Sequence, residues 1–460
     1  MENNDFLFKR ITEGIANTDF SGYTIQYPPM FLWGKARSNR EILRSWSESL
    51  ANNFRHLGLY VHIPFCKQKC SFCRYFSQEL AQRAALKDYL AALKKEIKIY
   101  KPLFSKFPLS SVYLGGGTPA LLNLGQLKEL FDTLYKSFNL NQCQQISFEG
   151  NPDFLPWPKL KLLKKYGVNR LTIGIQSLDS RVLESANRYQ SKESFERCFQ
   201  DARNAGIANI NVDLMAGLSG QTAKSVLKTL EEVIRLRPEM IHIHPFYPTA
   251  LTAFMQAGGQ LSKEEMDLRE HLAKISQAVI RQAGYAAIEF DANGLNPAAR
   301  NVQLSDAIEH NSAFLGLGAG AVSHATGYSR YVNLNDPDKY CYSLSQGKLP
   351  IQSTCRLTQR DEMIYFITSW LRYGRVSKER FRDIFKKDPD KVFAKEIAYL
   401  KTRKKIKDTP GFLCSKSANM GEYAIFSKYF YDQKIIAKCR AILSPLAGRI
   451  KRADMKYLYF

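Results

Sequence analysis

The chain has 460 residues, of which 45% are hydrophobic and 12% aromatic, so it carries enough apolar surface for a large core. That length suggests two or three domains, and the composition excludes a disordered chain, a collagen-like fibre and a mini-protein held by disulfides. The sequence shows neither the roughly 20 consecutive apolar residues of a membrane span nor a signal-like start. We therefore expect a soluble cytoplasmic protein without a membrane span.

The net charge is +23, and much of the positive excess lies near the end of the chain. From Arg375 onward there are 22 basic and 9 acidic residues. Such a field attracts nucleic acid, a membrane surface or a small polyanion, and a solvated surface explains it equally well. Nucleic acid is not the expected partner, because no module of stacking aromatic residues accompanies the charge.

The first predicted strand runs from Leu59 to Ile63, where apolar and β-branched residues are followed by Pro64. The loop after it carries three of the nine cysteines within eight residues, at positions 66, 70 and 73. The other six are scattered singly, as expected of core thiols in a reducing compartment.

Three thiolates at these spacings can converge on one iron–sulfur cluster if the loop wraps around it. With three protein ligands, one iron of a four-iron cluster stays open to a substrate or cosubstrate. A zinc site is the competing interpretation, but structural zinc takes four ligands and no second Cys/His pair at zinc spacing occurs. Chance clustering of buried thiols is the remaining alternative.

Five further apolar runs predict strands, and the stretches between them have apolar residues at helical spacing. The strands are expected at 111–114, 145–148, 170–175, 210–215 and 240–244, and the helices at 88–100, 124–138, 160–166, 193–205 and 222–236. Six strands alternating with helices indicate a parallel sheet, either open or rolled into a barrel. In both cases the chemistry gathers at the carboxyl ends of the strands.

Polar or glycine-rich segments follow several of these strands. The glycines at 115–117 let the backbone approach a ligand closely. Glu149 would need a cationic partner where it leaves a buried strand, and Arg188 could clamp a carboxylate through two hydrogen bonds. Taken singly, each residue could equally be a helix cap or a structural ion pair. His244 is either a core or capping residue or part of a pocket floor.

Cys66, Cys70 and Cys73, with the aromatic Phe72 before the third cysteine, resemble the hallmark of the radical S-adenosylmethionine (SAM) superfamily. The string from Tyr60 to Cys66 resembles its HemN-like branch, that of the oxygen-independent coproporphyrinogen III oxidases and their relatives. The resemblance implies an α/β fold, a partial (β/α)6 barrel with a small C-terminal helical, winged-helix-like domain. We expect an extended N-terminal arm at 1–55, the barrel with its closing segment at 56–325 and the basic C-terminal domain at 326–460.

The resemblance also implies the cofactors. The three cysteines would hold a 4Fe–4S cluster, with one or two molecules of SAM beside it. One electron from the reduced cluster would split SAM into methionine and a 5'-deoxyadenosyl radical, with flavodoxin or ferredoxin as the type of electron donor. The implied SAM contacts are Tyr60, Phe72, Gly116, Gly117, Thr118, Glu149, Gln176, Arg188 and Asp213. No catalytic residue is expected beyond the cofactors, because the protein supplies placement and dryness.

The expected substrate is an anionic tetrapyrrole or a similar conjugated molecule, changed by oxidation or methyl transfer. Cys73-Arg74-Tyr75 departs from the Cys-Gly-Cys typical of the porphyrinogen decarboxylases, which counts against direct decarboxylation. Haem-chaperone relatives often carry His-Asn-x-x-Tyr-Trp, and the segment from His310 to Leu315 keeps the His and Asn without the Tyr and Trp. His310 is therefore either a candidate haem ligand or a structural hydrogen-bonding residue, and a haem-delivering chaperone is the alternative function.

Overall fold

Six parallel strands form the centre of the molecule in the computed structural model. The model describes residues 27–35, 38–53, 56–248, 252–259, 261–288, 292–416, 423 and 426–443. The six strands lie side by side in chain order and confirm the predicted ones: β2 (Leu57–Ile63), β5 (Ser111–Gly116), β6 (Gln145–Gly150), β7 (Arg170–Gln176), β8 (Asn209–Ala216) and β9 (Met240–Pro245).

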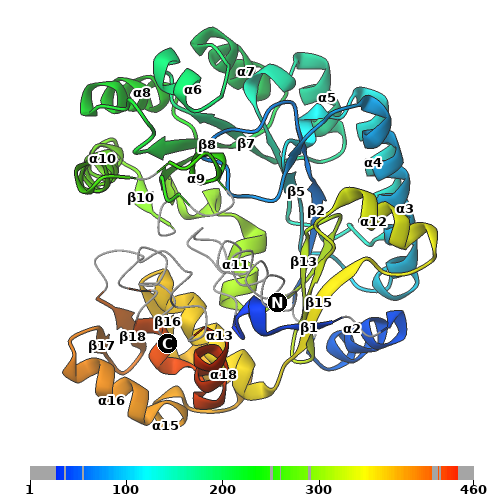
Figure 1. Ribbon diagram of the computed structural model, residues 1–460, viewed down its shortest axis with the longest axis vertical. Helices are drawn as coiled ribbons and strands as arrows, with labels where there is room; N and C mark the ends of the chain where they lie inside the picture. The colour runs from blue at the N-terminus through cyan, green and yellow to red at the C-terminus, as the bar shows by residue number, and fades with distance from the viewer. Residues whose placement is uncertain are drawn as a thin grey trace.

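Helices follow the strands and cover the outer face of the sheet (Figure 1). They are α3 (Arg83–Phe104), α4 (Leu124–Ser137), α5 (Trp157–Lys165), α6 (Ser180–Ser185), α7 (Lys192–Asn204), α8 (Ala223–Arg235) and α10 (Lys263–Gln282). Side chains cap several helix starts; Asn123 and Thr222, for example, form capping boxes at α4 and α8. The crossover helices explain why all six strands run in the same direction.

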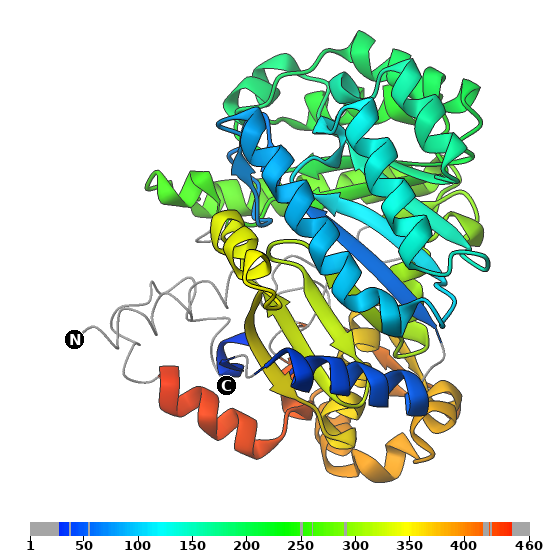
Figure 2. The ribbon, with the colours of Figure 1, turned by 90° about the vertical axis from the view of Figure 1, so that its right-hand side faces the viewer.

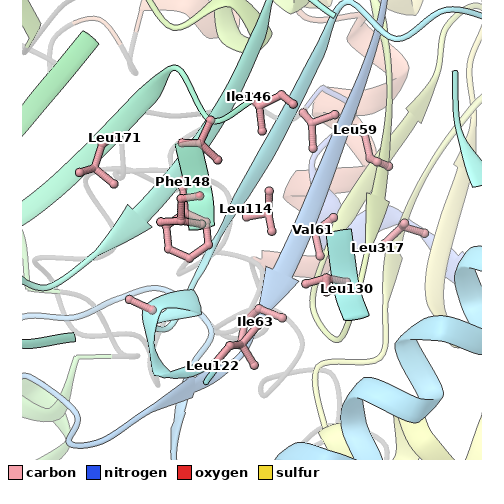
Figure 3. Packing of buried hydrophobic residues seen from close by; sticks show 14 of the residues in the cluster. Leu59, Val61, Ile63, Leu114, Leu122, Leu130, Ile146, Phe148, Leu171 and Leu317 are labelled. Atoms are coloured by element: carbon pink, nitrogen blue, oxygen red, sulfur yellow. The ribbon is translucent and has the colours of Figure 1, made fainter. Parts of the chain in front are cut away.

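Both faces of the parallel strands are buried, which is why their sequences read as continuous apolar runs. Leu59, Val61 and Ile63 of β2 pack among Leu114, Phe148 and other apolar side chains of neighbouring strands (Figure 3). This core fixes the carboxyl ends of the strands at one edge of the barrel.

The sheet continues beyond the six strands on both sides. On one side β12 (Ala313–Leu317) pairs parallel to β2, and three antiparallel neighbours and a two-residue edge strand follow: β13 (Val322–Ala325), β14 (Ser329–Asn333), β15 (Ile351–Arg356) and β1 (Gly34–Lys35). On the other side lie β11 (Ala292–Gly294) and β10 (Ala286–Ala287). Among the described residues β1 does not pair with β10, so the barrel is partial.

Short elements connect the larger ones or line their ends. They are β3 (Phe65–Cys66), β4 (Gln78–Glu79), η2 (Pro119–Leu121), η3 (Pro152–Phe154), α9 (Ala253–Gln256), η4 (Pro297–Ala299), α11 (Val302–Glu309) and α12 (Pro337–Ser345). No helix within the described ranges is long and apolar enough to cross a membrane.

The N-terminal segment is not the extended arm that the sequence suggests, as far as the structure describes it. It forms η1 (Met30–Leu32), β1 and the 15-residue helix α2 (Asn39–Asn53), which lies along the antiparallel strands (Figure 2). Trp46 of α2 is fully buried and donates a hydrogen bond to the Tyr331 hydroxyl at 2.8 Å. The prediction missed this helix because its partner lies almost 300 residues away in the sequence.

The C-terminal domain begins later than residue 326, because that position falls between the paired strands β13 and β14. A separate apolar cluster contains Tyr27 and otherwise only residues from Met363 onward. Its elements surround the small antiparallel sheet β16-β18-β17: α13 (Gln359–Arg372), β16 (Arg375–Ser377), α14 (Lys378–Phe385), α15 (Pro389–Val392), α16 (Ala394–Thr402), β17 (Ile406–Asp408), β18 (Phe412–Ser415), η5 (Lys428–Phe430) and α18 (Gln433–Leu443).

A buried polar network joins this domain to the barrel. Glu362 of α13 accepts hydrogen bonds from His324 at 2.8 Å, from the Gly327 amide at 2.7 Å and from Asn311 at 3.0 Å. Burial alone would raise the pKa of Glu362, but His324, the charge of Arg330 and the Gly327 amide lower it to about 2. The carboxylate is therefore ionised and well supplied with donors.

We predict that Glu362→Ala lowers the free energy of unfolding by roughly 3 kcal/mol, because it leaves the donors of buried His324 and Asn311 and of the Gly327 amide without their acceptor. Urea unfolding at pH 7.5, followed by circular dichroism, measures the change. Glu379→Ala on the exposed side of α14 is the control and should change stability by no more than about 0.5 kcal/mol. Equal stability of the two variants would contradict the role of Glu362.

Candidate active site

A cavity of about 670 Å³ lies at the carboxyl ends of the parallel strands. It is lined by every cysteine of the predicted cluster motif and by every predicted SAM contact: Cys66, Cys70, Cys73, Tyr60, Phe72, Gly116, Gly117, Thr118, Glu149, Gln176, Arg188 and Asp213. These residues come from five different strands and from the cysteine loop, so only the parallel arrangement brings them together.

The cysteine loop is anchored to the segment after α6. The Ser71 amide donates to the Ala186 carbonyl at 3.0 Å, and the Asn187 side chain donates to the Lys69 carbonyl at the same distance. Asn187 also accepts from Gln68 and has a positive φ of 53°. Phe72 packs into an apolar cluster that includes Met215 and Phe246. No sequence pattern predicts the role of Gln68 or Asn187, because they anchor the cysteine loop through contacts between distant segments.

Cys66 is buried, Cys70 and Cys73 are partly buried, and thiolates at these positions would repel one another. Burial raises the pKa of Cys73 to about 11, and the neighbouring Cys66 and Cys70 add to the effect. Burial also raises the pKa of Cys66. Thr118 donates to the Cys66 sulfur at 3.5 Å, and Arg188 donates to the Cys70 sulfur at 3.6 Å. A thiol with a raised pKa stays protonated in water and releases its proton to the solvent when its sulfur coordinates a metal, so the set fits an iron–sulfur cluster with three protein ligands.

The glycine run after β5 leaves room for the cysteine loop. Gly116 has a φ of 116°, which a residue with a side chain rarely adopts. A Cβ atom at Gly117 would lie 2.7 Å from the Phe65 carbonyl oxygen and 3.0 Å from the Cys66 sulfur. At Gly117 the need for glycine is purely steric, because its φ lies outside the left-handed region.

Glu149 brings a carboxylate to the cavity without a cation to balance it. Burial raises its pKa to about 7, and a hydrogen bond from the Tyr113 hydroxyl opposes that rise. No Lys or Arg in the described part of the chain forms an ion pair with Glu149, and Arg170 attracts it only weakly while donating to Thr172. A buried carboxyl group of this kind fits a ligand that offers an amino group.

Asp213 is the second carboxylate of the cavity, and it lies beside two stacked histidines. Burial would raise its pKa, but His242, His244 and Asn211 lower it below its ordinary value. The Asn211 side chain donates to Asp213 at 2.7 Å, and His244 Nε2 lies 3.9 Å away. His244 lines the cavity, so of its two interpretations the structure supports the pocket floor.

Gln176 and Arg188 lie at the irregular end of β7. Gln176 has a positive φ of 66°, at a point where the register with β8 shifts. A non-glycine residue in this conformation carries strain, which in proteins is often kept at functional sites. Arg188 donates to the Gly174 carbonyl and to Gln190 besides Cys70, so its guanidinium is held beside the cysteine loop.

His62 of β2 also lines the cavity. Its Nε2 lies 2.9 Å from the Phe76 carbonyl oxygen and its Nδ1 lies 2.9 Å from the Tyr60 hydroxyl. Burial lowers the pKa of His62 to about 4, so the ring is neutral and donates from Nε2. The imidazole therefore fixes Tyr60 at the cavity wall and has no nitrogen left for a metal.

Another part of the cavity wall comes from η1, near the N-terminus, and from segments between residues 301 and 353. Its wall there contains amide side chains and apolar groups from η1, α11 and the antiparallel strands: Met30, Phe31, Asn301, Gln303, Leu304, Val322, Asn335 and Gln352. Lys69 and Arg74 also line the cavity and bring positive charge to it. This second half of the lining contains none of the predicted SAM contacts.

His310 does not line this cavity. Its ring stacks on that of His56, with 4.4 Å between the ring centres, at the opposite end of β2 from the cysteine loop. Of the predicted site residues it is the one that the fold separates from the rest.

Comparisons with known proteins agree with this geometry. The family model described as the radical SAM superfamily matches residues 60–233. The heme chaperone HemW of Bacillus subtilis is 28% identical over 340 residues, which cover 73% of this chain and 88% of that protein. An oxygen-independent coproporphyrinogen III oxidase of Pseudomonas aeruginosa is 30% identical over 64% of this chain and 67% of its own length. That of Salmonella typhimurium is 34% identical, but the match spans only 52% of each protein.

The structure of the coproporphyrinogen III oxidase HemN from Escherichia coli has the same fold. It superimposes with a TM-score of 0.77 over 90% of this chain and 97% of that one, at 22% identity. The chain belongs to the radical SAM superfamily, and within it to the HemN-like proteins. The family implies a 4Fe–4S cluster and SAM.

We predict that Gly117→Ala lowers the iron content per chain to less than half of the wild-type value, because the added methyl group displaces the Cys66 loop. Iron and sulfide analysis of protein purified without oxygen measures the effect. Gly125→Ala at the start of α4 is the control, since a Cβ there would meet only Asn123 at 3.4 Å. Full iron content in Gly117→Ala would show that the close approach is not needed.

Proposed function

We propose that the protein is a radical SAM enzyme that acts on a tetrapyrrole or a similar anionic, conjugated substrate. The observation that carries the proposal is the convergence of three thiols, a carboxylate without a cation and a glycine cradle in one cavity. Cys66, Cys70 and Cys73 would hold the 4Fe–4S cluster, and an electron donor such as flavodoxin or ferredoxin would reduce it. When bound, the cluster and SAM supply the one-electron and radical chemistry.

The remaining residues of the cavity would bind and orient SAM. Glu149 would accept hydrogen bonds from its amino group, and the backbone at Gly116 and Gly117 with Thr118 would hold the methionyl part. Arg188 lies beside Cys70, where it could pair with the SAM carboxylate, and Asp213 could accept from the ribose hydroxyls. Tyr60, Phe72 and Gln176 would close the pocket around the cofactor and exclude water.

The second half of the cavity would take the substrate. The names of the relatives, coproporphyrinogen III oxidase and heme chaperone, both refer to tetrapyrroles. Lys69 and Arg74 would attract an anionic ligand, while the apolar side chains of Met30 and Phe31 would contact its conjugated surface. Oxidation and methyl transfer are both compatible with this arrangement.

A haem-delivering chaperone is the second candidate, because the match to HemW covers 88% of that relative. In this case haem iron would bind a side chain such as His310. The two functions require different things of the molecule: the enzyme must release 5'-deoxyadenosine in response to a substrate, whereas the chaperone must bind haem stoichiometrically.

The deciding experiment uses protein purified without oxygen and reduced with dithionite. We expect an electron paramagnetic resonance signal of a four-iron cluster that changes on adding SAM, and 5'-deoxyadenosine release that a porphyrinogen or haem stimulates at least severalfold. Cys70→Ala should lose both, whereas Cys143→Ala, which lies outside the cavity, should keep them. Stoichiometric haem binding that His310→Ala abolishes, without stimulated release, would instead favour the chaperone.

The pKa of Glu149 predicts how SAM binding depends on pH. A carboxyl group with a pKa of about 7 is protonated below pH 7 and must lose its proton to accept from the SAM amino group. The affinity of the wild type for SAM should therefore fall up to about tenfold per pH unit below pH 7. Equilibrium binding to the cluster-loaded protein measures this slope.

Glu149→Gln should bind SAM more weakly and lose that part of the slope. Glu231→Gln on the exposed side of α8 is the control and should behave like the wild type. An identical pH dependence in Glu149→Gln and wild type would show that Glu149 does not bind SAM. That result would leave the assignment of the cluster ligands unaffected.

A further inference from the structure

A second cluster of metal-ligating side chains lies away from the cavity. It consists of His56, just before β2, and of Asp306 and His310, which are one turn apart on and after α11. One ligand atom from each lies within 4.8 Å of the other two. The His56 Nδ1 to Asp306 Oδ2 distance is 3.5 Å.

Asp306 provides an independent indication of a missing partner. Its side chain is 7% exposed, and no described group donates a hydrogen bond to its Oδ2 atom. A buried carboxylate oxygen without a donor is costly, and a cation is the partner that relieves the cost. The 3.5 Å approach of His56 is too long to replace a hydrogen bond.

The two imidazoles are suited to be ligands. Their rings stack at 4.4 Å with an angle of 19° between the planes, an arrangement that disfavours two charged rings. A neutral imidazole nitrogen is the form that coordinates a metal.

The surroundings of the cluster also favour a cation. His310 is the C-cap residue of α11, so the free carbonyl groups and the negative end of the helix dipole lie beside it. Arg300 is positive, but Glu309 lies 3.4 Å from it and offsets its charge. His56 is about one third exposed, which gives an ion a way in and lets the ring turn toward Asp306.

We propose that His56, Asp306 and His310 form a binding site for a divalent transition metal such as Zn²⁺, with water as the fourth ligand. Two imidazoles and one carboxylate are a common ligand set for this class of ion. In a tetrahedral site the ligand atoms lie ~3.3 Å apart, close to the 3.5 Å between His56 Nδ1 and Asp306 Oδ2. The site is separate from the cluster, because a strand of seven residues, about 23 Å long, lies between them.

The position suggests what the metal does. Trp370 of α13 donates to the Ile308 carbonyl of α11, and Asn311 donates to Glu362 of the same helix. An ion bound to α11 and to the start of β2 would therefore hold the helix that carries the C-terminal domain against the barrel. It would also occupy His310, so haem iron and Zn²⁺ would compete for that ring.

The test uses the full chain with its iron–sulfur cluster intact and Zn²⁺ as the probe. In competition with a chromophoric chelator we expect one equivalent of Zn²⁺ per chain, with at least tenfold weaker binding in Asp306→Asn and in His310→Ala. His271→Ala, an exposed histidine on α10, is the control and should bind as the wild type does. Equal iron content and circular dichroism among the variants would show that they fold.

X-ray absorption at the zinc edge identifies the ligands without interference from iron. We expect nitrogen and oxygen at about 2.0–2.1 Å and no sulfur at about 2.3 Å. Sulfur ligands, or binding that Asp306→Asn leaves unchanged, would overturn the proposal. Neither result would bear on SAM cleavage, which does not involve these residues.

Discussion

The site depends on how closely the backbone after β5 approaches the loop after β2. At Gly117 the two chains come so near that a single methyl group would overlap the Phe65 carbonyl oxygen. Gly318, in the loop after β12, makes a similar approach from the other side, where a Cβ would lie 2.4 Å from the His62 carbonyl oxygen. The strands β2, β5 and β12 are thus locked together by contacts that only glycine permits.

A buried carboxylate keeps the second of these contacts in place. Glu96 of α3 accepts from the Gly318 amide at 2.8 Å and from Asn333 at 2.7 Å. Tyr89 of the same helix bridges the His62 carbonyl and the Ala319 amide. The outer helix therefore holds the loop after β12 through polar contacts, in a region where an unpaired carboxylate would be expensive.

The sequence predicts the parts of the molecule that depend on local pattern. The six strands are apolar runs bounded by turn residues, and the cysteines and the residues at the strand ends follow from their position after those runs. The helix α2, the division between the domains and the role of His62 could not be predicted in this way. The helix and the domain boundary depend on contacts between distant segments, such as Trp46 with Tyr331. The role of His62 depends on the path of the cysteine loop, which brings the Phe76 carbonyl to its Nε2.

The carboxyl groups of the cavity contrast with the positive charge of the C-terminal part of the chain. The chain as a whole is strongly basic, yet the carboxyl groups of Glu149 and Asp213 both face the cavity. The positive excess lies mainly in the C-terminal part of the chain. A ligand that carries both an amino group and carboxylates would find complementary groups in the cavity, whereas the surface charge would act on it only at longer range.

The network around Glu362 has a consequence for the evolution of the chain. His324 and the Gly327 amide belong to β13 and to the turn after it, but both donate to Glu362 of α13, so the barrel contains polar groups that are satisfied only in the presence of the C-terminal domain. A barrel cut before Thr358 would retain these groups without their acceptor. Loss or exchange of the C-terminal domain would thus require compensating substitutions inside the barrel, so the two parts are constrained to change together.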